Sequence, residues 1–380
     1  MKKILYISGS RSDYGLIRST LLLIKEHPRL NVEIVATGMH LMGDFGNTLK
    51  EINKEGLKVH LIKAIYKRDN RESVVEFLGN LILGLLKEIK RINPNMVFIQ
   101  GDRPEMLGAA IASTYLNIPI IHSHGGEKTS TVDEIARHAI TKLSHIHLVA
   151  TKKAAKRIER LGEEKWRIFV VGAPGLDDIA DNRLLSNREI ARKYKLDSSK
   201  PILILLYHPV GSIQETSFQI KEVMEAIKEL KYQTIAIYPN ADPGGRAIIK
   251  VINSYNRKLD FIRIYKNIPR KEYLSLMKIA SALVGNSSSG IIEAPSFRLP
   301  FVNIGERQEG RERSNNVVDV DCDSTKIKSA IEKAIYNKSF KEKVRKSKNP
   351  YGDGNAGKRI VNILDKIKID RRLLQKKITY

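Results

Sequence analysis

Cysteine is almost absent from this chain, since Cys322 is the single one in 380 residues. One cysteine excludes an internal disulfide framework and fits a reducing compartment, so we expect a cytoplasmic location. No apolar run approaches the length of a membrane span, so we expect no membrane partner. The apolar stretch at residues 4–7 is also too short for a secretion signal and is soon followed by Arg11 and Asp13. It therefore predicts a first β-strand.

Aromatic residues make up only 6% of the chain, and neither a zinc-finger spacing nor an RNP-type aromatic motif occurs. The excess of 66 Lys and Arg over 42 Asp and Glu, a net charge of +24, would otherwise invite a nucleic-acid role. These cations are spread along expected helices, and the densest clusters lie at 341–348 and 366–377. We interpret them as solvated helix faces that also attract anionic small molecules, and we expect no nucleic-acid partner.

Short β-branched runs alternate with amphipathic stretches along the whole chain. Apolar strands separated by helices indicate parallel sheets covered on both faces, so we predict an α/β fold with doubly wound, Rossmann-like domains. The expected strands are 3–7, 32–36, 58–62, 96–100, 118–122, 147–150, 167–171, 202–206, 234–238, 261–263, 282–284 and 301–303. The clearest expected helices are 14–26, 72–91, 104–116 and 133–143.

The alternation pauses around residues 173–175 and restarts after a polar stretch at 182–200 that we expect to be helical. A chain of 380 residues fits two domains. We place the first domain at 1–180 and the second at 181–355. Helical periodicity in 358–377 predicts that the closing segment, 356–380, packs back on the first domain.

The sequence GNSSSG at 285–290 follows an expected strand and is followed by Ile291, Ile292 and Glu293. It predicts a strand, a tight turn and a helix start, which is either an ordinary Ser-rich cap or a phosphate site. Glu293 is placed to accept hydrogen bonds from a ribose diol. A second Gly-bearing loop, SGSRSDY at 8–14, lacks the GxGxxG pattern, so a dinucleotide fold is a weak interpretation.

Polar residues also follow other expected strands, and ligands bind at the carboxyl ends of strands in open α/β sheets. Asp102 and Arg103 come after strand 96–100, and Pro104 suits the first position of a helix. Asp102 is therefore either a helix cap or a functional carboxylate. Asp133 opens a helix and is likewise either a cap or a catalyst.

The sequence HSHGGE at 122–127 suggests zinc at first sight, because a strand would place His122 and His124 on one face. No third ligand is evident, so we expect no metal and no cofactor. The glycine pair before Glu127 instead allows a substrate to come close.

With these segments in order, the chain resembles the hydrolysing UDP-N-acetylglucosamine 2-epimerases, which make N-acetylmannosamine for sialic-acid synthesis. The resemblance covers almost the whole sequence. Its motifs are SRSDY (10–14), GMHL (38–41), GDR (101–103), DEIARHAITK (133–142), HP (208–209), NAD (240–242), GNSS (285–288), GERQ (305–308) and YGDGN (351–355).

This resemblance implies the GT-B arrangement, with two Rossmann-like domains facing across a cleft, and a UDP-sugar as substrate. By position, it implies that UDP is held by Arg11, Arg103, His208, Asn240, Ser287, Ser288, Glu293 and Arg307. At Gly15 the animal enzyme has a UDP-contacting serine, which is a mild departure. Arginine suits a diphosphate because its charge persists and its fork pairs two oxygens.

The implied reaction removes the proton at sugar C2 while UDP leaves C1, and water then adds with return of a proton to the opposite face of C2. The candidate acid/base groups are Asp102, Asp133 and Asp177. Several relatives carry glutamate where this chain has His124, and Glu127 could serve instead.

Several alternatives remain. Non-hydrolysing epimerases typically show Thr after the Gly-Asp pair and lack the run at 137–142, so Arg103 and that run favour the hydrolysing branch. The motifs bind the nucleotide and do not indicate which groups the sugar carries at C4 and C6. A UDP-diacetamidobacillosamine 2-epimerase is therefore the nearest alternative. A GT-B glycosyltransferase is more distant. We expect a homodimer or homotetramer.

Overall fold

The computed structural model describes residues 1–45, 48–130, 132–180 and 184–380. Its contacts divide the chain into two compact units. Unit 1 comprises Met1–Asp181 with Tyr351–Tyr380, and unit 2 comprises Asn182–Pro350. The domain boundary expected at 180/181 adjoins residues outside the described ranges, and the chain re-enters unit 1 at Tyr351, slightly before the segment expected to start at 356.

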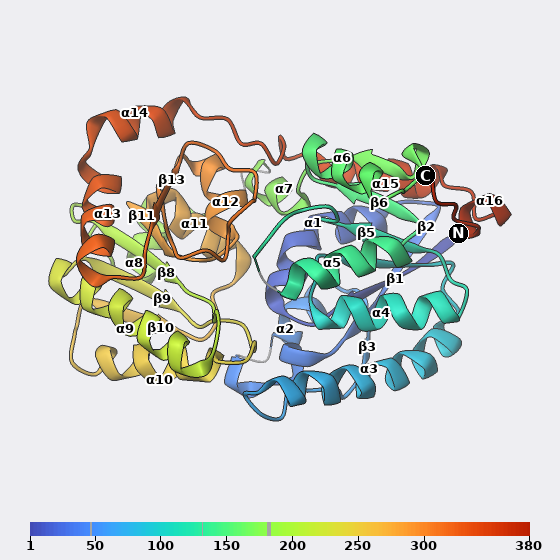
Figure 1. Ribbon diagram of the computed structural model, residues 1–380, viewed down its shortest axis with the longest axis horizontal. Helices are drawn as coiled ribbons and strands as arrows, with labels where there is room; N and C mark the ends of the chain where they lie inside the picture. Colours follow the sequence, from blue (N-terminus) through green and yellow to red (C-terminus); the bar gives the residue numbers. More distant parts are fainter. Residues whose placement is uncertain (46–47, 131, 181–183) are drawn as a thin grey trace. The chain divides into compact units, whose positions relative to one another are not determined.

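Unit 1 is built on a parallel sheet that has seven strands in the described residues, in the order β3-β2-β1-β4-β5-β6-β7 (Figure 1). The strands are β1 (Lys2–Ser8), β2 (Leu30–Ala36), β3 (Lys58–Leu61), β4 (Met96–Gln100), β5 (Ile120–Ser123), β6 (Ile146–Val149) and β7 (Ile168–Val170). Every pairing in this sheet is parallel, as buried β-branched strands separated by helices predict.

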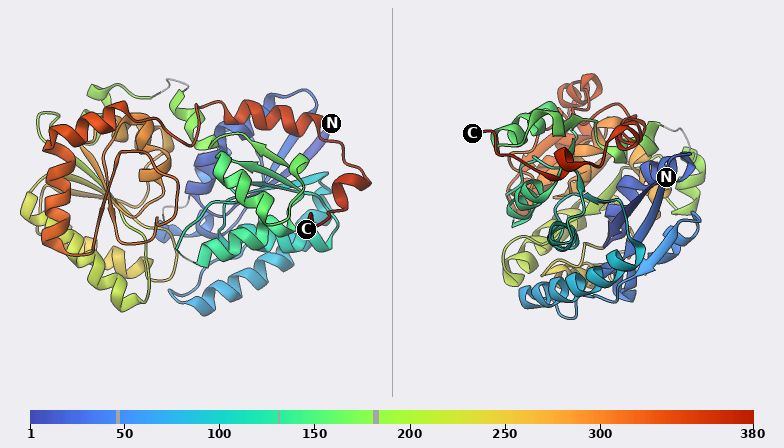
Figure 2. Two further views of the ribbon diagram at one scale, coloured as in Figure 1. Left: turned by 45° about the horizontal axis from the view of Figure 1, so that its top comes forward. Right: turned by 90° about the vertical axis from the view of Figure 1, so that its right-hand side faces the viewer.

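Helices cover both faces of this sheet (Figures 1 and 2). On one face α3, α4 and α5 lie side by side. On the other face α1 packs against α15, and Ile4 and Tyr6 of β1 point into their common core. The helices of unit 1 are α1 (Arg11–Glu26), α2 (Leu49–Asn53), α3 (Arg71–Ile92), α4 (Pro104–Tyr115), α5 (Val132–Leu143), α6 (Lys152–Arg160), α7 (Asp177–Ala180), α15 (Ala356–Lys366) and α16 (Arg371–Leu374).

Unit 2 repeats this design with six parallel strands in the described chain, ordered β10-β9-β8-β11-β12-β13. The strands are β8 (Ile202–Leu206), β9 (Gln233–Ile237), β10 (Ile262–Tyr265), β11 (Ala282–Gly285), β12 (Phe301–Ile304) and β13 (Val317–Val320). The helices are α8 (Asn187–Lys193), α9 (Ile213–Leu230), α10 (Gly245–Asn256), α11 (Arg270–Ile279), α12 (Ser289–Ile292), α13 (Ser324–Tyr336) and α14 (Lys338–Lys346).

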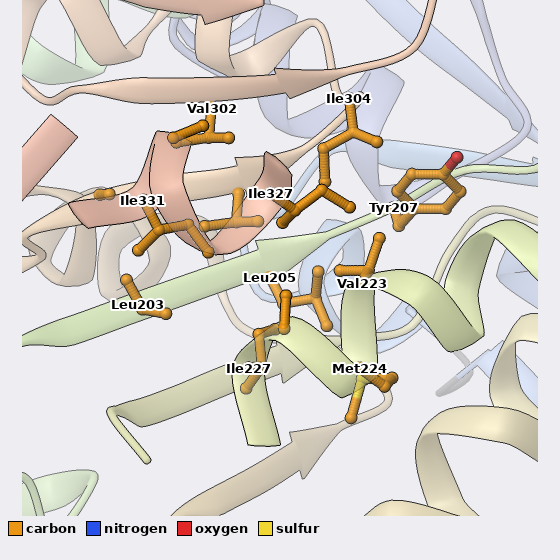
Figure 3. Close-up of a cluster of buried hydrophobic side chains, with 14 of the residues drawn as sticks. Leu203, Leu205, Tyr207, Val223, Met224, Ile227, Val302, Ile304, Ile327 and Ile331 are labelled. Atoms are coloured by element: carbon orange, nitrogen blue, oxygen red, sulfur yellow. The ribbon is translucent and has the colours of Figure 1, made fainter. Parts of the chain in front are cut away.

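The core of unit 2 is a continuous aliphatic cluster between the sheet and helices α9 and α13 (Figure 3). Leu203 and Leu205 of β8 face Val223 and Ile227 of α9, and all four side chains are fully buried. Alternate residues of a strand share one face, which explains why these two leucines reach the same helix. Across the described residues, none of the helices combines the length and apolar character needed to cross a membrane.

Two expectations about local structure were wrong, and one strand was not expected. Only Asn187–Lys193 of the stretch 182–200 is helical, because Ser186 caps it with Glu189 and Lys195 has a left-handed backbone at its end; residues 182 and 183 lie outside the described ranges. The segment 358–377 is interrupted between α15 and α16, where Asp370 caps a new turn. Strand β13, with its short sequence VVDV, was not expected.

A buried carboxylate fixes the C-terminal segment on unit 1. Glu163 is 1% exposed, forms ion pairs with Lys142 at 2.8 Å and Lys376 at 2.7 Å, and lies 3.1 Å from Nε2 of His147. Burial alone would raise the pKa of Glu163, but these donors outweigh it and lower that pKa to about 2. The segment is held further by Arg167, which donates to the backbone oxygens of Leu373 and other residues of the same turn.

We therefore predict that Glu163→Ala lowers the free energy of unfolding by about 3 kcal/mol, because the partly buried Lys376 loses its counter-charge and the buried His147 loses its partner. Because the folded pKa lies below the ordinary value of 4.5, the contribution of Glu163 is fully present above pH 4.5 and is lost as the pH falls toward 2. Urea unfolding at several pH values measures both effects. Glu159→Ala, which removes a surface partner of Lys165, is the control and should change stability by less than about 1 kcal/mol. Equal effects of the two variants would contradict the prediction.

Candidate active site

The strand order of unit 1 reverses between β1 and β4, and the loops after these strands therefore diverge at the carboxyl edge of the sheet. Asp13 organises the first loop. Its carboxylate accepts hydrogen bonds from the Ser8 hydroxyl at 2.5 Å and from the backbone N–H groups of Gly9 and Ser10 at 3.0 and 2.7 Å. Burial raises the pKa of Asp13, while these donors oppose the shift. The Asp13 carboxylate thus holds in place the loop that precedes Arg11.

The second loop brings Arg103 to the same edge of the sheet. Its Nε lies 3.3 Å from a carboxylate oxygen of Glu105, which is fully buried and also accepts a hydrogen bond from Tyr66 at 2.9 Å. A Cβ atom at Gly9 would lie 2.3 Å from the Glu105 side chain, so glycine is required there. The charge of Arg103 also favours the ionised form of Asp13, which indicates that the two loops are electrostatically linked.

His40, within the GMHL motif, is a buried residue beside the first loop for which the sequence predicted no role. Its Nε2 lies 2.8 Å from the Ser8 hydroxyl and its Nδ1 lies 2.7 Å from that of Thr48. Burial lowers its pKa to about 4, so the imidazole is neutral at physiological pH. It therefore supports the loop through neutral hydrogen bonds.

Asp102 lies at the carboxyl end of β4 and is paired with a buried arginine. Arg137 of α5 is 1% exposed and donates one N–H to the Asp102 carboxylate and another to the backbone oxygen of Glu127, at 2.8 Å in the latter case. One guanidinium therefore fixes the loop after β4 and the loop after β5 together. Asp102 does not cap α4, since the N-cap position of that helix is Arg103.

His124 and Glu127 form a hydrogen-bonded pair in the loop after β5. His124 Nδ1 lies 2.6 Å from Glu127 Oε1, and both residues are at most 8% exposed. The backbone at His124 is left-handed, with φ of 62°, a region that histidine adopts more readily than most residues. The neighbouring His122 instead donates from Nε2 to the Gly101 oxygen at 2.8 Å, and burial lowers its pKa to about 3.

The two remaining carboxylates from the sequence occupy different surroundings. Asp133 lies in the first turn of α5 and is partly exposed, beside Glu134, which accepts the N–H of Thr129. Asp177 is 8% exposed, and its two oxygens accept the N–H groups of Ala356 and Gly357 at 2.9 and 2.6 Å. Asp177 therefore holds the start of α15, and burial raises its pKa against these donors.

The strand order of unit 2 reverses between β8 and β11, and a single asparagine joins the loops that follow them. Asn286 Oδ1 accepts the N–H of His208 at 2.7 Å, and its Nδ2 donates to the His208 oxygen at 2.8 Å. A Cβ at the preceding Gly285 would lie 2.1 Å from the Leu206 oxygen, so only glycine allows this close approach. The backbone oxygen of Asn286 accepts hydrogen bonds from Arg307 at 3.2 Å and Gln308 at 2.8 Å.

The Ser-rich segment turns more tightly than expected. Helix α12 is the single turn Ser289–Ile292, and a 3-10 turn with Pro295 follows it. Glu293 lies at the junction, not inside a longer helix, and the helix-dipole contribution expected for a phosphate is correspondingly small. Ser287 is 4% exposed and its hydroxyl accepts the Ser289 N–H at 3.3 Å, whereas Ser288 is partly exposed.

The other residues expected to bind UDP lie as follows. In unit 2, the N–H of Asn240 points at His208 Nδ1 at 3.5 Å, so His208, Asn240, Arg307 and the Ser-rich turn form one hydrogen-bonded group with Asn286. In unit 1, Gly15 is buried inside α1. Asn286 and Gln308 stand within motifs visible in the sequence, but nothing in their spacing predicted a supporting role.

Within the described ranges, no group of three or more His, Cys, Asp and Glu side chains is arranged to hold a metal ion. The two histidines that suggested zinc have separate hydrogen-bond partners in Gly101 and Glu127. The site is thus built from paired charges and backbone groups.

Comparison with known proteins identifies the family of this chain. Residues 23–365 match the family model described as UDP-N-acetylglucosamine 2-epimerase. The chain belongs to the UDP-N-acetylglucosamine 2-epimerase family. The chain is 39% identical over 378 residues to the UDP-N,N'-diacetylbacillosamine 2-epimerase (hydrolyzing) of Legionella pneumophila, covering 99% of each protein.

The chain is also 35% identical over 335 residues to the UDP-N-acetylglucosamine 2-epimerase of Neisseria meningitidis serogroup B, covering 88% of each. A solved structure of UDP-GlcNAc 2-epimerase from Neisseria meningitidis bound to UDP-GlcNAc has a TM-score of 0.80 at 18% identity, over 95% of this chain and 99% of that one. The expected fold class, two Rossmann-like units of the GT-B kind, is thereby confirmed.

We predict that Asn286→Ala weakens UDP binding about tenfold and lowers stability by about 2 kcal/mol, because the buried N–H and C=O of His208 lose their partners. Isothermal titration with UDP and urea unfolding measure the two effects. Asn256→Ala, at the exposed end of α10, is the control and should leave both unchanged. Unaltered UDP affinity in Asn286→Ala would separate this asparagine from the nucleotide site.

Proposed function

We propose that this chain is a hydrolysing 2-epimerase of a UDP-2-acetamido sugar. The observation that carries the proposal is the network in which Arg137 links the Asp102 carboxylate to the loop of the His124–Glu127 pair. Such a network supplies two separate groups able to move protons. Two are needed because the proton that leaves C2 and the proton that returns are on opposite faces of the sugar.

The proposed reaction has two stages. First, a base takes the C2 proton, the C1–O bond breaks, and UDP leaves with the electron pair, so a C1–C2 double bond forms. Water then loses one proton to a basic group and forms the new C1–O bond as a hydroxyl, while an acid returns a proton to C2 from the other face. The product is the free 2-epimerised sugar. The C2 hydrogen is weakly acidic, so both stages depend on positioned acid/base groups.

His124 is one of the two groups in this proposal, and Glu127 acts through it. A carboxylate beside Nδ1 fixes the tautomer with the proton on Nδ1, which leaves Nε2 as the atom that exchanges protons with the substrate. The two residues that the sequence offered as alternatives thus act as a pair. Asp102 is the second group, and Asp133 is a further candidate in the first turn of α5.

The nucleotide half of the proposal rests on unit 2. Arg307 provides a cation of the kind that a departing diphosphate requires, and Ser287, Ser288 and His208 lie in the loops that Asn286 joins. Arg11 and Arg103 are candidate cations of the same kind in unit 1. Asp177 serves the fold in this scheme, since backbone N–H groups occupy both its oxygens.

Two sugars are supported to a comparable extent. The Legionella relative is named for UDP-N,N'-diacetylbacillosamine and the Neisseria relative for UDP-N-acetylglucosamine, at 39% and 35% identity. With UDP-N-acetylglucosamine the product would be N-acetylmannosamine, a precursor of sialic acids. The two substrates differ at C4 and C6, away from the reacting carbons.

The first experiment offers the purified protein UDP-N-acetylglucosamine, UDP-diacetamidobacillosamine and UDP-glucose in D2O with EDTA and no acceptor. We predict release of UDP and a free 2-epimerised sugar with one deuterium at C2 from at least one acetamido substrate, and none from UDP-glucose. Mass spectrometry and NMR identify the product. A 2-epimer still attached to UDP would indicate a non-hydrolysing enzyme, and a product without deuterium would reject proton abstraction at C2.

We further predict that Asp102→Asn and Glu127→Gln each lower kcat by about a hundredfold or more, since a general acid or base contributes factors of roughly 10²–10⁴. The Kd for UDP should change by less than about threefold, because neither residue is assigned to the nucleotide. Glu159→Gln, on the exposed face of α6, is the control with unchanged turnover. Wild-type rates in either variant would remove that residue from the mechanism.

A further inference from the structure

Helix α11 holds both ends of the turn that carries the nucleotide candidates of unit 2. Its first residue, Arg270, forms an ion pair with Glu293 at the end of α12. One turn later, the Tyr273 hydroxyl lies 2.5 Å from the hydroxyl of Ser289 at the start of α12. Neither Arg270 nor Tyr273 stands in a motif that the sequence singled out.

The two carboxylate oxygens of Glu293 have different surroundings. Oε1 is buried and faces the Arg270 guanidinium. Oε2 accepts no hydrogen bond from the described residues. It is also not one of the fully buried oxygens without a partner, so it is in contact with solvent. Glu293 as a whole is only 3% exposed. Arg270 thus takes one oxygen and leaves the other for a ligand that approaches from the surface.

A buried carboxylate of this kind requires a counter-charge, because burial of an unpaired anion is costly. The pairing also limits rotation of the side chain, so the remaining oxygen has a fixed direction. An oxygen fixed in this way can favour a ligand that presents a hydroxyl at that place over one that lacks it. The matching group on a uridine nucleotide is a ribose hydroxyl.

We propose that Arg270 is a positioning residue that orients the Glu293 carboxylate toward the ribose hydroxyls and thereby makes the site select ribonucleotides over deoxyribonucleotides. This inference rests on the proposed nucleotide role of unit 2. It adds a residue and a selectivity that the proposed reaction does not require.

The test compares the Kd values of UDP and 2′-deoxy-UDP by isothermal titration. For the wild type we expect UDP to bind at least about tenfold more tightly, the factor that a hydrogen bond to a charged group provides. In Arg270→Gln the ratio of the two Kd values should fall below about threefold. Glu293→Gln, which is nearly isosteric, should reduce the ratio in the same way and remains informative if Arg270→Gln does not fold.

Two matched controls separate orientation from general damage. Tyr273→Phe removes the contact of the same helix with the other end of α12, so it should weaken both nucleotides equally and keep their ratio. Arg257→Gln removes an exposed cation of the same unit and should change neither Kd. A wild-type ratio in Arg270→Gln, or an equal loss of ratio in Tyr273→Phe, would overturn the inference.

The outcomes also distinguish this inference from the proposed function. A wild-type protein that binds no UDP would reject the nucleotide site itself. A wild type that binds UDP but does not discriminate against 2′-deoxy-UDP, or a Glu293→Gln variant that keeps the ratio, would reject the role of Glu293 and Arg270 while leaving the epimerase reaction in place.

Discussion

The reversal of strand order in each sheet is the constraint on which the candidate residues of each unit depend. Between β1 and β4, and again between β8 and β11, consecutive connections leave the sheet toward opposite faces. The two loops at each reversal cannot cover one another, so backbone groups and polar side chains remain at the edge. In unit 1 this edge carries Arg11 and Arg103, and in unit 2 it carries His208 and the Ser-rich turn.

Two ion pairs with buried members lie near these edges, and each holds two segments together. Arg137 is almost fully buried, and its contacts with Asp102 and the Glu127 backbone join loops from two neighbouring strands. Glu293 and Arg270 do the same for α12 and α11. Such pairs add little net stability relative to an apolar core, but loss of one partner is costly, so they restrict each loop to one arrangement. That restriction suits a site where proton donors and acceptors must stay within hydrogen-bond reach of a substrate.

Strands were predictable where burial on both faces produces an uninterrupted β-branched run. Residues 96–100 and 202–206 were predicted with the bounds that β4 and β8 have in the structure. The edge strand β13 was not predicted from the sequence, because VVDV is short and only partly buried and contains Asp319. The break between α15 and α16 was also not predicted, since the Lys and Arg residues of that segment are compatible with a continuous helix. Its course is set by Arg167, about two hundred residues earlier, through hydrogen bonds to three backbone oxygens of the C-terminal turn.

The candidate site was predictable to the extent that its residues follow strands. Asp102, His124, His208 and Ser287 each lie directly after a strand of the described sheets, and alternation alone gives that placement. The hydrogen-bond partner of each of these side chains could not be predicted from the sequence, because bonds such as the one between Asn286 and His208 join residues 78 positions apart. Arg270 illustrates the limit most clearly. It opens an ordinary amphipathic helix, and only packing of α11 against α12 brings its charge to Glu293, where a neutral side chain would leave a buried anion unbalanced. Residues that position others through buried charge therefore emerge only from the structure, whereas the placement of polar residues at strand ends can be predicted from the pattern.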